Sequence, residues 1–143
     1  MRVLIGLMAA ALACGTAADE NAVKYRQHTM DAVGGHMSAL AEIVKGEVDH
    51  KDHIGVHVAG LAALSGIAPD LFGADSREGA DTHALPKIWE DPDTFKQRLT
   101  AFRTAAVDLD AVVKAGDMTK FPAAFGALGK SCKGCHDDFK KKD

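Results

Sequence analysis

The sequence is poor in aromatic residues, and this scarcity restricts the fold class. Aromatic side chains make up 6% of the 143 residues, while alanine and glycine are plentiful. A β-sandwich usually relies on aromatic and β-branched residues, whereas small residues allow helices to pack closely. Because 47% of the residues are apolar, the chain can still bury a substantial core. The composition therefore favours one domain of closely packed helices.

Strong charge and long apolar runs are also missing. The formal net charge is −3, and one short basic run occurs, at residues 140–142, so nucleic acid is not expected as a partner. The apolar stretch at residues 3–13 is eleven residues long, well short of the roughly 20 that a membrane-spanning helix needs. We therefore expect no stable membrane insertion.

The N-terminus instead has the features of a secretory signal peptide. Arg2 precedes the apolar stretch, and small residues at 15–18 offer a cleavage site. We expect residues 1–18 to be removed on export to the periplasm, which leaves residues 19–143 as the mature domain. Cys14 would leave with the signal peptide, so the mature chain would hold two cysteines, Cys132 and Cys135.

Apolar residues recur at helical spacing in four segments. Steps of three, four and seven residues place them on one face of each predicted helix. The four stripes are Val23, Met30, Val33, Met37, Leu40 and Val44; Ile54, Val58, Leu61 and Leu64; Phe95, Leu99, Phe102, Ala106, Leu109 and Val113; and Phe121, Phe125, Leu128, Cys132, Cys135 and Phe139.

The connections between these segments predict how the helices are arranged. The second and third segments are joined by a long stretch, about residues 67–90, that is rich in Gly, Asp, Ser and Pro. Asp91 and Pro92 suit the N-cap and first turn of the third helix. The other connections are short, which makes neighbouring helices antiparallel. We therefore predict an all-α fold, an antiparallel four-helix bundle with one long crossover loop between its second and third helices.

The motif that carries chemistry is C-x-x-C-H at residues 132–136, the signature of covalent haem c attachment. Positions i, i+3 and i+4 share a helix face, so both thiols can add to the vinyl groups on one porphyrin edge while the imidazole reaches the iron. A thioredoxin-like pair normally opens a helix after a strand, and a zinc site needs further ligands at suitable spacing. Neither condition is met. The sequence predicts one covalent haem c attached to Cys132 and Cys135, with His136 as an axial iron ligand.

From about residue 22 to residue 142, the chain resembles the class II c-type cytochromes, the cytochrome c′ family. The similarity is carried by the haem motif near the C-terminus and by residues 23–27, 44–46, 86–89 and 129–131. The resemblance implies that Arg26 and Gln27 lie near the haem edge, with Arg26 able to pair with a propionate. It also implies an approach of His83 to the haem, as in some members, and a basic residue, Lys140, close to the proximal imidazole.

The resemblance places Met30 opposite the iron. Some family members leave the sixth coordination position empty, and low-spin relatives bind a methionine sulfur there. The sequence offers a soft ligand and leaves two interpretations open: Met30 is the second axial ligand, or it is a non-ligating distal residue of the core. His28 and His36 lie off the interior stripe, which disfavours a bis-histidine haem.

These features predict electron transfer with small redox proteins as partners. A five-coordinate cytochrome c′ that binds NO or CO, for scavenging or sensing, is the alternative. An enzyme such as a peroxidase is not expected, because the stripe around Met30 offers no acid–base histidine. Homodimers are frequent in the family, and the chain is compatible with one.

Three histidines, His50, His53 and His57, cluster at the start of the predicted second helix and share a face. Two interpretations are open for them, a solvated helix face or a Zn or Cu site.

Overall fold

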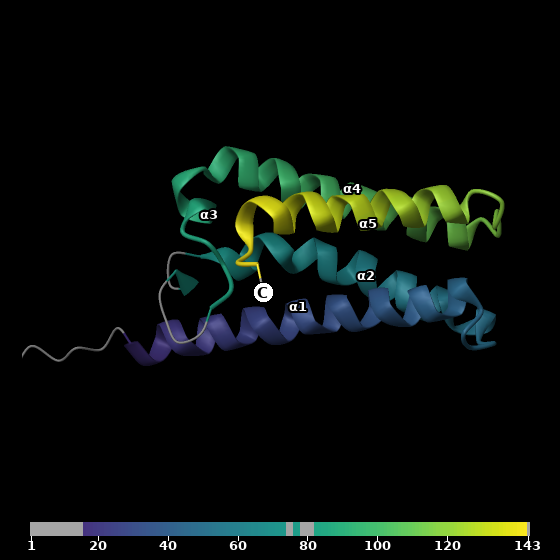
Figure 1. The fold of residues 1–143 in the computed structure, drawn as a ribbon, viewed down its shortest axis with the longest axis horizontal. Coiled ribbons are helices and arrows are strands. Elements are labelled where there is room, and N and C mark those ends of the chain that lie inside the picture. Colours follow the sequence, from purple (N-terminus) through teal and green to yellow (C-terminus); the bar gives the residue numbers. More distant parts are fainter. Residues whose placement is uncertain (1–15, 74–75, 78–81, 143) are drawn as a thin grey trace, which may run out of the picture.

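The computed structural model describes residues 16–73, 76–77 and 82–142. Four long helices lie side by side along the molecule (Figure 1): α1 (Thr16–Lys45), α2 (Ile54–Ile67), α4 (Pro92–Lys114) and α5 (Phe121–Phe139). The shorter elements are η1 (Lys51–His53), η2 (Ala68–Phe72) and α3 (Lys87–Glu90). The predicted antiparallel four-helix bundle is confirmed. Of the expected signal peptide, residues 1–15 lie outside the described part.

The bundle is held together by three strong helix pairs. α1 packs against α2, α2 against α4, and α4 against α5, whereas contact between α1 and α5 is much weaker. Each helix places a leucine with 0% exposure in the shared core: Leu40, Leu61, Leu109 and Leu128. The open seam of the bundle is therefore the one between α1 and α5.

The predicted stripe of α1 is wrong at its last position. Val44 is 49% exposed, and Ile43 is buried in its place, with 6% exposure. Near its C-terminus α1 packs against the beginning of α2, and Ile43 belongs to the same buried cluster as Ile54. The neighbouring helix, rather than the heptad spacing alone, decides which residue faces inward there.

A left-handed glycine ends α1. Gly46 has a φ of 74°. Its amide donates to the carbonyl of Ile43 at 3.1 Å, and the amide of Glu47 donates to the carbonyl of Glu42 at 3.0 Å. These bonds satisfy carbonyls that the last helical turn would otherwise leave unpaired.

We expect Gly46→Ala to lower the free energy of unfolding by about 1 kcal/mol, because a side chain disfavours the left-handed region. Gly126 within α5 is the matched control, since a Cβ there would meet no atom within 4 Å. Gly126→Ala should raise the stability by about 0.5–1 kcal/mol through helix propensity. Urea denaturation of both variants measures the difference, and changes of the same sign in both would contradict this account.

The described helix α3 of the long connection between α2 and α4 lies at the end of the bundle where the C-terminus also lies (Figure 1). Backbone hydrogen bonds attach the connection to the end of α5. The amide of Leu85 donates to the carbonyl of Phe139 at 2.9 Å, and the amide of Lys141 donates to the carbonyl of His83 at 2.8 Å. The segment predicted as a crossover loop therefore contains η2 and α3 and covers one end of the bundle.

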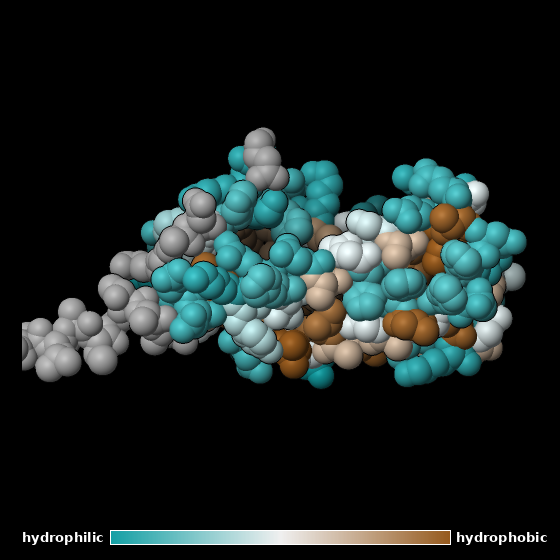
Figure 2. Space-filling model, turned by 90° about the horizontal axis from the view of Figure 1, so that it is seen from below, coloured by the Kyte–Doolittle hydropathy of each residue, from teal (hydrophilic) through white to brown (hydrophobic). Residues whose placement is uncertain are grey.

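Within the described ranges, residues 51–72 form one stretch that is long and apolar enough to cross a membrane, judged by length and composition. Its inner side, with Ile54, Val58 and Leu61, belongs to the bundle core. Its outer side includes Val56, which is 68% exposed, and Ile67, which is 40% exposed. Figure 2 views the bundle from below and shows other apolar side chains exposed among hydrophilic ones. The stretch is apolar because its inner side belongs to the bundle core and its outer side also carries exposed apolar residues.

α1 and α2 approach each other closely at a pair of histidines. The Nδ1 atoms of His36 and His57 lie 3.0 Å apart. A Cβ at Gly60 would lie 2.6 Å from the Nε2 of His36, so the glycine makes room for this ring. Burial, together with the nearby His36 and His53, lowers the pKa of His57 from its ordinary 6.5.

We expect this pair to make the bundle less stable in acid. Because the pKa of His57 is lower in the folded protein, the unfolded chain takes up the proton first. The stabilisation is complete above the ordinary pKa of 6.5 and is lost as the pH falls from there through the lower folded-state value. Urea midpoints between about pH 8 and pH 5 measure this dependence, and His57→Gln should flatten it. A dependence as steep in the variant as in the parent protein would show that other groups cause it.

Candidate functional site

A cavity lies between α1 and α5, along the open seam of the bundle. Its volume is about 680 Å³, within the range of about 300–1,000 Å³ that is typical of cofactor sites. Its walls are largely apolar and come from α1, the long connection and α4, with Val33, Phe72, Ile88, Phe95, Leu99 and Phe102 among the lining residues. Such a cavity suits a flat, mostly apolar prosthetic group.

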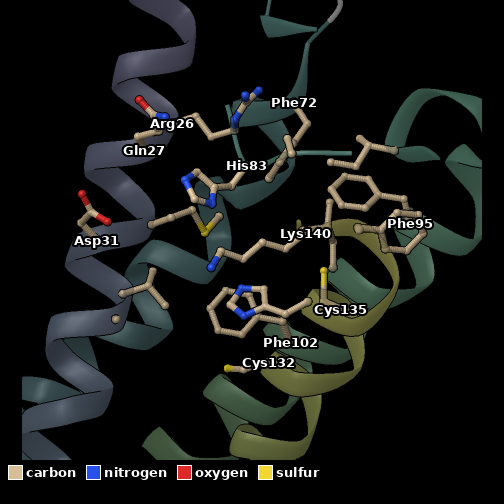
Figure 3. Close-up of a pocket in the computed structure, with 18 of the residues that line it drawn as sticks. Arg26, Gln27, Asp31, Phe72, His83, Phe95, Phe102, Cys132, Cys135 and Lys140 are labelled. Atoms are coloured by element: carbon tan, nitrogen blue, oxygen red, sulfur yellow. The ribbon is translucent and has the colours of Figure 1, made fainter. Parts of the chain in front are cut away.

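α5 brings the three reactive side chains of the haem motif to this cavity. Cys132, Cys135 and His136 all line it, because their spacing places them on one side of the helix. Both cysteines are half-buried free thiols. Figure 3 shows them on the α5 side of the cavity, with α1 on the other side.

The surroundings of the motif decide the chemical state of these groups. Burial, with a contribution from Cys132, raises the pKa of the Cys135 thiol to about 11, and burial also raises the pKa of Cys132. Redox-active dithiols show the opposite shift. His136 remains accessible, while burial and then Lys140 lower its pKa. A neutral imidazole is the form that ligates a metal. The site therefore suits covalent thioethers and an imidazole ligand better than thiol–disulfide exchange.

α1 supplies the wall that faces the motif. Most of the α1 lining residues are related by steps of three and four, in agreement with one helix face. They are Arg26, Gln27, His28, Met30, Asp31, Val33 and Gly34. Met30 is half-buried and packs against the main core cluster. His28 is exposed and also lines the cavity, whereas His36 pairs with His57 on α2. The structure thus brings Met30 to the same cavity as His136.

Arg26 is a buried cation at this cavity, with 3% exposure. Its guanidinium donates to the carbonyl of Ser76 at 2.8 Å and to the Oγ1 of Thr82 at 2.7 Å. It also lies 5.3 Å from the centre of the Phe72 ring. Burial lowers the pKa of Arg26, but a guanidinium stays protonated in proteins. A fixed positive charge beside an apolar cavity suits the acidic edge of a ligand.

Sequence reasoning missed Ser76 and Thr82, the two hydrogen-bond partners of Arg26. Both lie in the irregular connection, where no helical or strand periodicity marks a residue as facing inward. Their separation from Arg26 by 50 and 56 positions gave no local signal either. Only the folded connection shows that they fix the guanidinium.

Two further basic residues lie at the cavity, where the connection meets the end of α5. A backbone bridge pairs Ala84 with Lys140, and both His83 and Lys140 line the cavity. In Figure 3 the Lys140 side chain extends from α5 toward α1, with His83 and Arg26 beyond it. The residues implied by the family resemblance are therefore gathered around a single cavity.

The cavity fits a haem in size and chemistry. It offers two free thiols for the vinyl groups, an imidazole for the iron, apolar walls for the ring and basic side chains for the propionates. These groups come from four parts of the chain, which are α1, the long connection, α4 and α5. The fold brings these groups together at one cavity, whereas the haem motif alone supplies the two thiols and the imidazole.

Comparison with known proteins agrees with this fit. The family described as Cytochrome C' matches residues 21–140. The chain belongs to the cytochrome c′ family. Cytochrome c′ from Alcaligenes xylosoxydans xylosoxydans is 41% identical over 124 residues, which cover 86% of this chain and 95% of that protein.

Solved cytochrome c′ structures share the fold. The protein from Rubrivivax gelatinosus has a TM-score of 0.80 and 31% identity, covering 88% of this chain and 99% of that chain. A ferrous variant from Alcaligenes xylosoxidans with bound NO has a TM-score of 0.79 and 40% identity, covering 89% and 98%. As a member of the cytochrome c′ family, the chain binds one covalent haem c with its iron.

The chain also carries the predicted histidine group. His57 lies within hydrogen-bond distance of His36 on α1 and also near His53. The metal-site interpretation of His50, His53 and His57 stays a prediction. His50 and His53 remain together, with rings stacked at 4.8 Å between centroids.

Proposed function

We propose that this cytochrome c′ transfers electrons in the periplasm through a haem bound by thioethers from Cys132 and Cys135 and by the imidazole of His136. The observation that carries the proposal is the meeting of these three side chains at one largely apolar cavity inside a helical bundle. When bound, the haem supplies one-electron chemistry at its iron. The apolar side chains that line the cavity would shield the ring from water, which would limit rearrangement between oxidation states.

Arg26, Gln27, His83 and Lys140 have supporting roles in this proposal. Arg26 is held by the connection and presents a positive charge to the propionate edge. Gln27, His83 and Lys140 line the same cavity, and Lys140 is close enough to His136 to lower the pKa of its imidazole. Charge-assisted hydrogen bonds from such groups orient the porphyrin and compensate its carboxylates.

Rapid-mixing experiments on the haem-loaded protein test electron transfer. We expect reversible reduction and reoxidation by small periplasmic redox proteins, with no net consumption of substrate that would indicate an enzyme. Exchange too slow to serve any such partner would contradict the proposal.

NO or CO binding is the second candidate function. The observation in its favour is that solved relatives include NO complexes, while Met30 and Val33 contribute apolar side chains to the α1 wall. Titrating the ferrous protein with NO and CO tests it, and an absence of spectral change with both gases would exclude gas binding.

Whether the sulfur of Met30 ligates the iron determines whether electron transfer and gas binding compete for the same coordination position. If its sulfur ligates the iron, the ferric spectrum is low-spin with a sulfur-to-iron band at long wavelength, and a gas must displace the sulfur. If it does not ligate, the ferric spectrum is high-spin. Met30→Leu is the matched variant, because it keeps the size of the side chain and removes the sulfur. It should change the spin state only in the ligated case.

The proposal includes export. Residues 1–18 would act as the signal peptide, and residues 19–143 would form the haem-carrying domain. The mass and N-terminal sequence of the protein recovered from the periplasm test both boundaries, and a mature protein that begins at Met1 would contradict them.

A homodimer is also proposed, with α1 and α2 at the interface. Its support is the exposed apolar side of these helices, which includes Tyr25 at 62% exposure, Val56 and Ile67. Isolated exposed apolar residues are ordinary, but several on adjacent helices suit an interface. Sedimentation of the parent protein and of Val56→Lys tests this, since a charge at the interface should produce monomers.

A further inference from the structure

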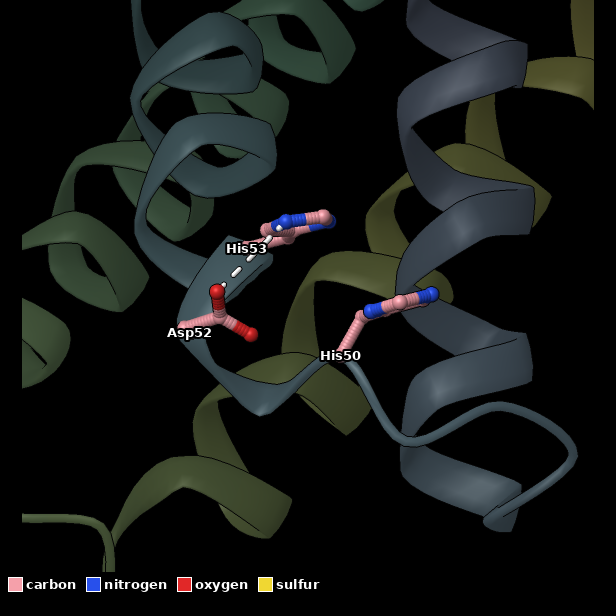
Figure 4. Close-up of side chains that lie close together, drawn as sticks. All are labelled: His50, Asp52 and His53. Carbon is pink, nitrogen blue, oxygen red and sulfur yellow. Dashed lines mark ion pairs between the residues drawn. The ribbon is translucent and has the colours of Figure 1, made fainter.

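The turn that joins α1 to α2 lies at the end of the bundle opposite α3 and the C-terminus (Figure 1). It carries a second group of ligating side chains. This group consists of His50, Asp52 and His53, all of them exposed. One ligating atom from each residue, an imidazole nitrogen or a carboxylate oxygen, lies within 4.8 Å of the others. Figure 4 shows the carboxylate of Asp52 directed toward the ring of His53, with His50 across the turn.

The backbone explains why these side chains meet. The amide of His53 donates to the carbonyl of His50 at 2.9 Å and closes the turn of η1. In a 3₁₀ turn the side chains at i and i+3 are eclipsed, and the two rings are accordingly stacked with an interplanar angle of 8°. The Oδ2 of Asp52 lies 3.5 Å from the Nε2 of His53.

The turn lies between two fixed points of the fold. Gly46 ends α1 in the left-handed conformation four residues before His50, and Ile54, directly after His53, is buried in the main core. The backbone of the turn is therefore anchored by the bundle, while its three side chains are exposed and have room to reorient. A cation would find the ligands already gathered and would only have to reorient them.

We propose that His50, Asp52 and His53 bind one divalent transition metal ion of the Zn²⁺ or Cu²⁺ type. Two imidazoles and a carboxylate form a donor set that these ions accept, with water completing the coordination. The stacked rings do not aim both lone pairs at one point, so one exposed imidazole turns about its side-chain torsions on binding. The bound ion would then connect the start of α2 to the turn that precedes this helix.

The pair of His36 and His57 is the competing location, because its nitrogens are also close. Those rings are at 66° to each other, and their Nδ1 atoms are within hydrogen-bond distance. The pair offers two ligands, whereas the turn offers three. Variants of each group separate the two locations.

Calorimetric titration of the haem-loaded protein with Zn²⁺ tests the proposal. We expect one ion per chain, with the Soret band unchanged because the cluster lies away from the haem cavity. His50→Ala and His53→Ala should each weaken binding by about tenfold or more, which corresponds to at least about 1.4 kcal/mol, and Asp52→Asn should weaken it less. Lys51→Ala, an exposed residue in the same turn, is the matched control and should leave the affinity within about twofold.

Two results would overturn the proposal. The first is an absence of Zn²⁺ binding up to millimolar concentration. The second is binding that is lost in His36→Ala or His57→Ala but kept in His50→Ala, which would place the ion at the pair of His36 and His57. Circular dichroism of each variant shows whether it is folded, and the exposure of the three residues leads us to expect that all are.

Discussion

Replacing Cys132 and Cys135 together with alanine is expected to abolish covalent haem attachment. Each thioether requires one of these thiols, and the mature chain offers no other cysteine if residues 1–18 are removed. His136 could still hold the iron of a free haem, but one imidazole at an open cavity gives reversible binding. The protein isolated from a host that matures c-type cytochromes should therefore lack the added mass of a haem under denaturing conditions.

The same double variant should also be less stable than the parent protein. The cavity of about 680 Å³ is lined largely by apolar side chains, and without the porphyrin these surfaces lose their packing partner. A covalently attached porphyrin adds its own buried surface to the core of the folded protein. Thermal unfolding followed by circular dichroism should show a lower midpoint in the double variant.

Lys133→Ala provides the control for this experiment. Lys133 lies between the two cysteines in sequence, but it is exposed and its side chain pairs with Asp137 on the surface. It should carry a full complement of haem. A covalent haem adduct that persists in the double cysteine variant would refute the assignment of the attachment site.

The spacing of apolar residues was sufficient to predict the helices of the bundle because each helix buries one continuous face. Leu40, Leu61, Leu109 and Leu128 were all identified in this way and have 0% exposure. The haem motif was equally accessible to sequence reasoning, since its three reactive residues are close together in the chain. Both the helix stripes and the haem motif depend on the spacing of residues that are close together in the chain, and this spacing can be read directly from the sequence.

The remaining features depend on contacts between distant segments. The meeting of His36 with His57 requires the packing of α1 on α2. The error at Val44 has a similar origin, because the start of α2 determines which side of α1 is covered. The connection around Ser76 and Thr82 is irregular, so its contact with Arg26 could be found only in the folded chain.

Arg26→Gln is expected to lower the free energy of unfolding by about 2–4 kcal/mol, because hydrogen bonds from a buried charged group are among the costly ones to lose. The change removes the guanidinium donor from the carbonyl of Ser76 and leaves the Oγ1 of Thr82 with the amide of Ala84 as its donor. It also removes the guanidinium that lies over the rings of Phe72 and Trp89. The connection should then be held less firmly against α1.

Arg26→Lys separates the effect of the positive charge from the effect of the guanidinium geometry. Lysine keeps the positive charge but has neither the planar fork nor the stacking surface of arginine, so its stability should lie between those of the parent protein and Arg26→Gln. Arg103→Ala is a control for the loss of an exposed arginine on α4, and such surface changes usually stay within about 0.5 kcal/mol. Urea denaturation of the haem-loaded proteins measures all three.

The reduction potential tests whether Arg26 also acts on the haem. A positive charge near the propionates favours the reduced state, which carries one positive charge fewer, so Arg26→Gln should lower the potential and Arg26→Lys should largely restore it. A purely structural role would affect stability in both variants without this difference in potential. An unchanged potential in folded, haem-loaded Arg26→Gln would therefore separate Arg26 from the haem edge and leave it as a support for the connection alone.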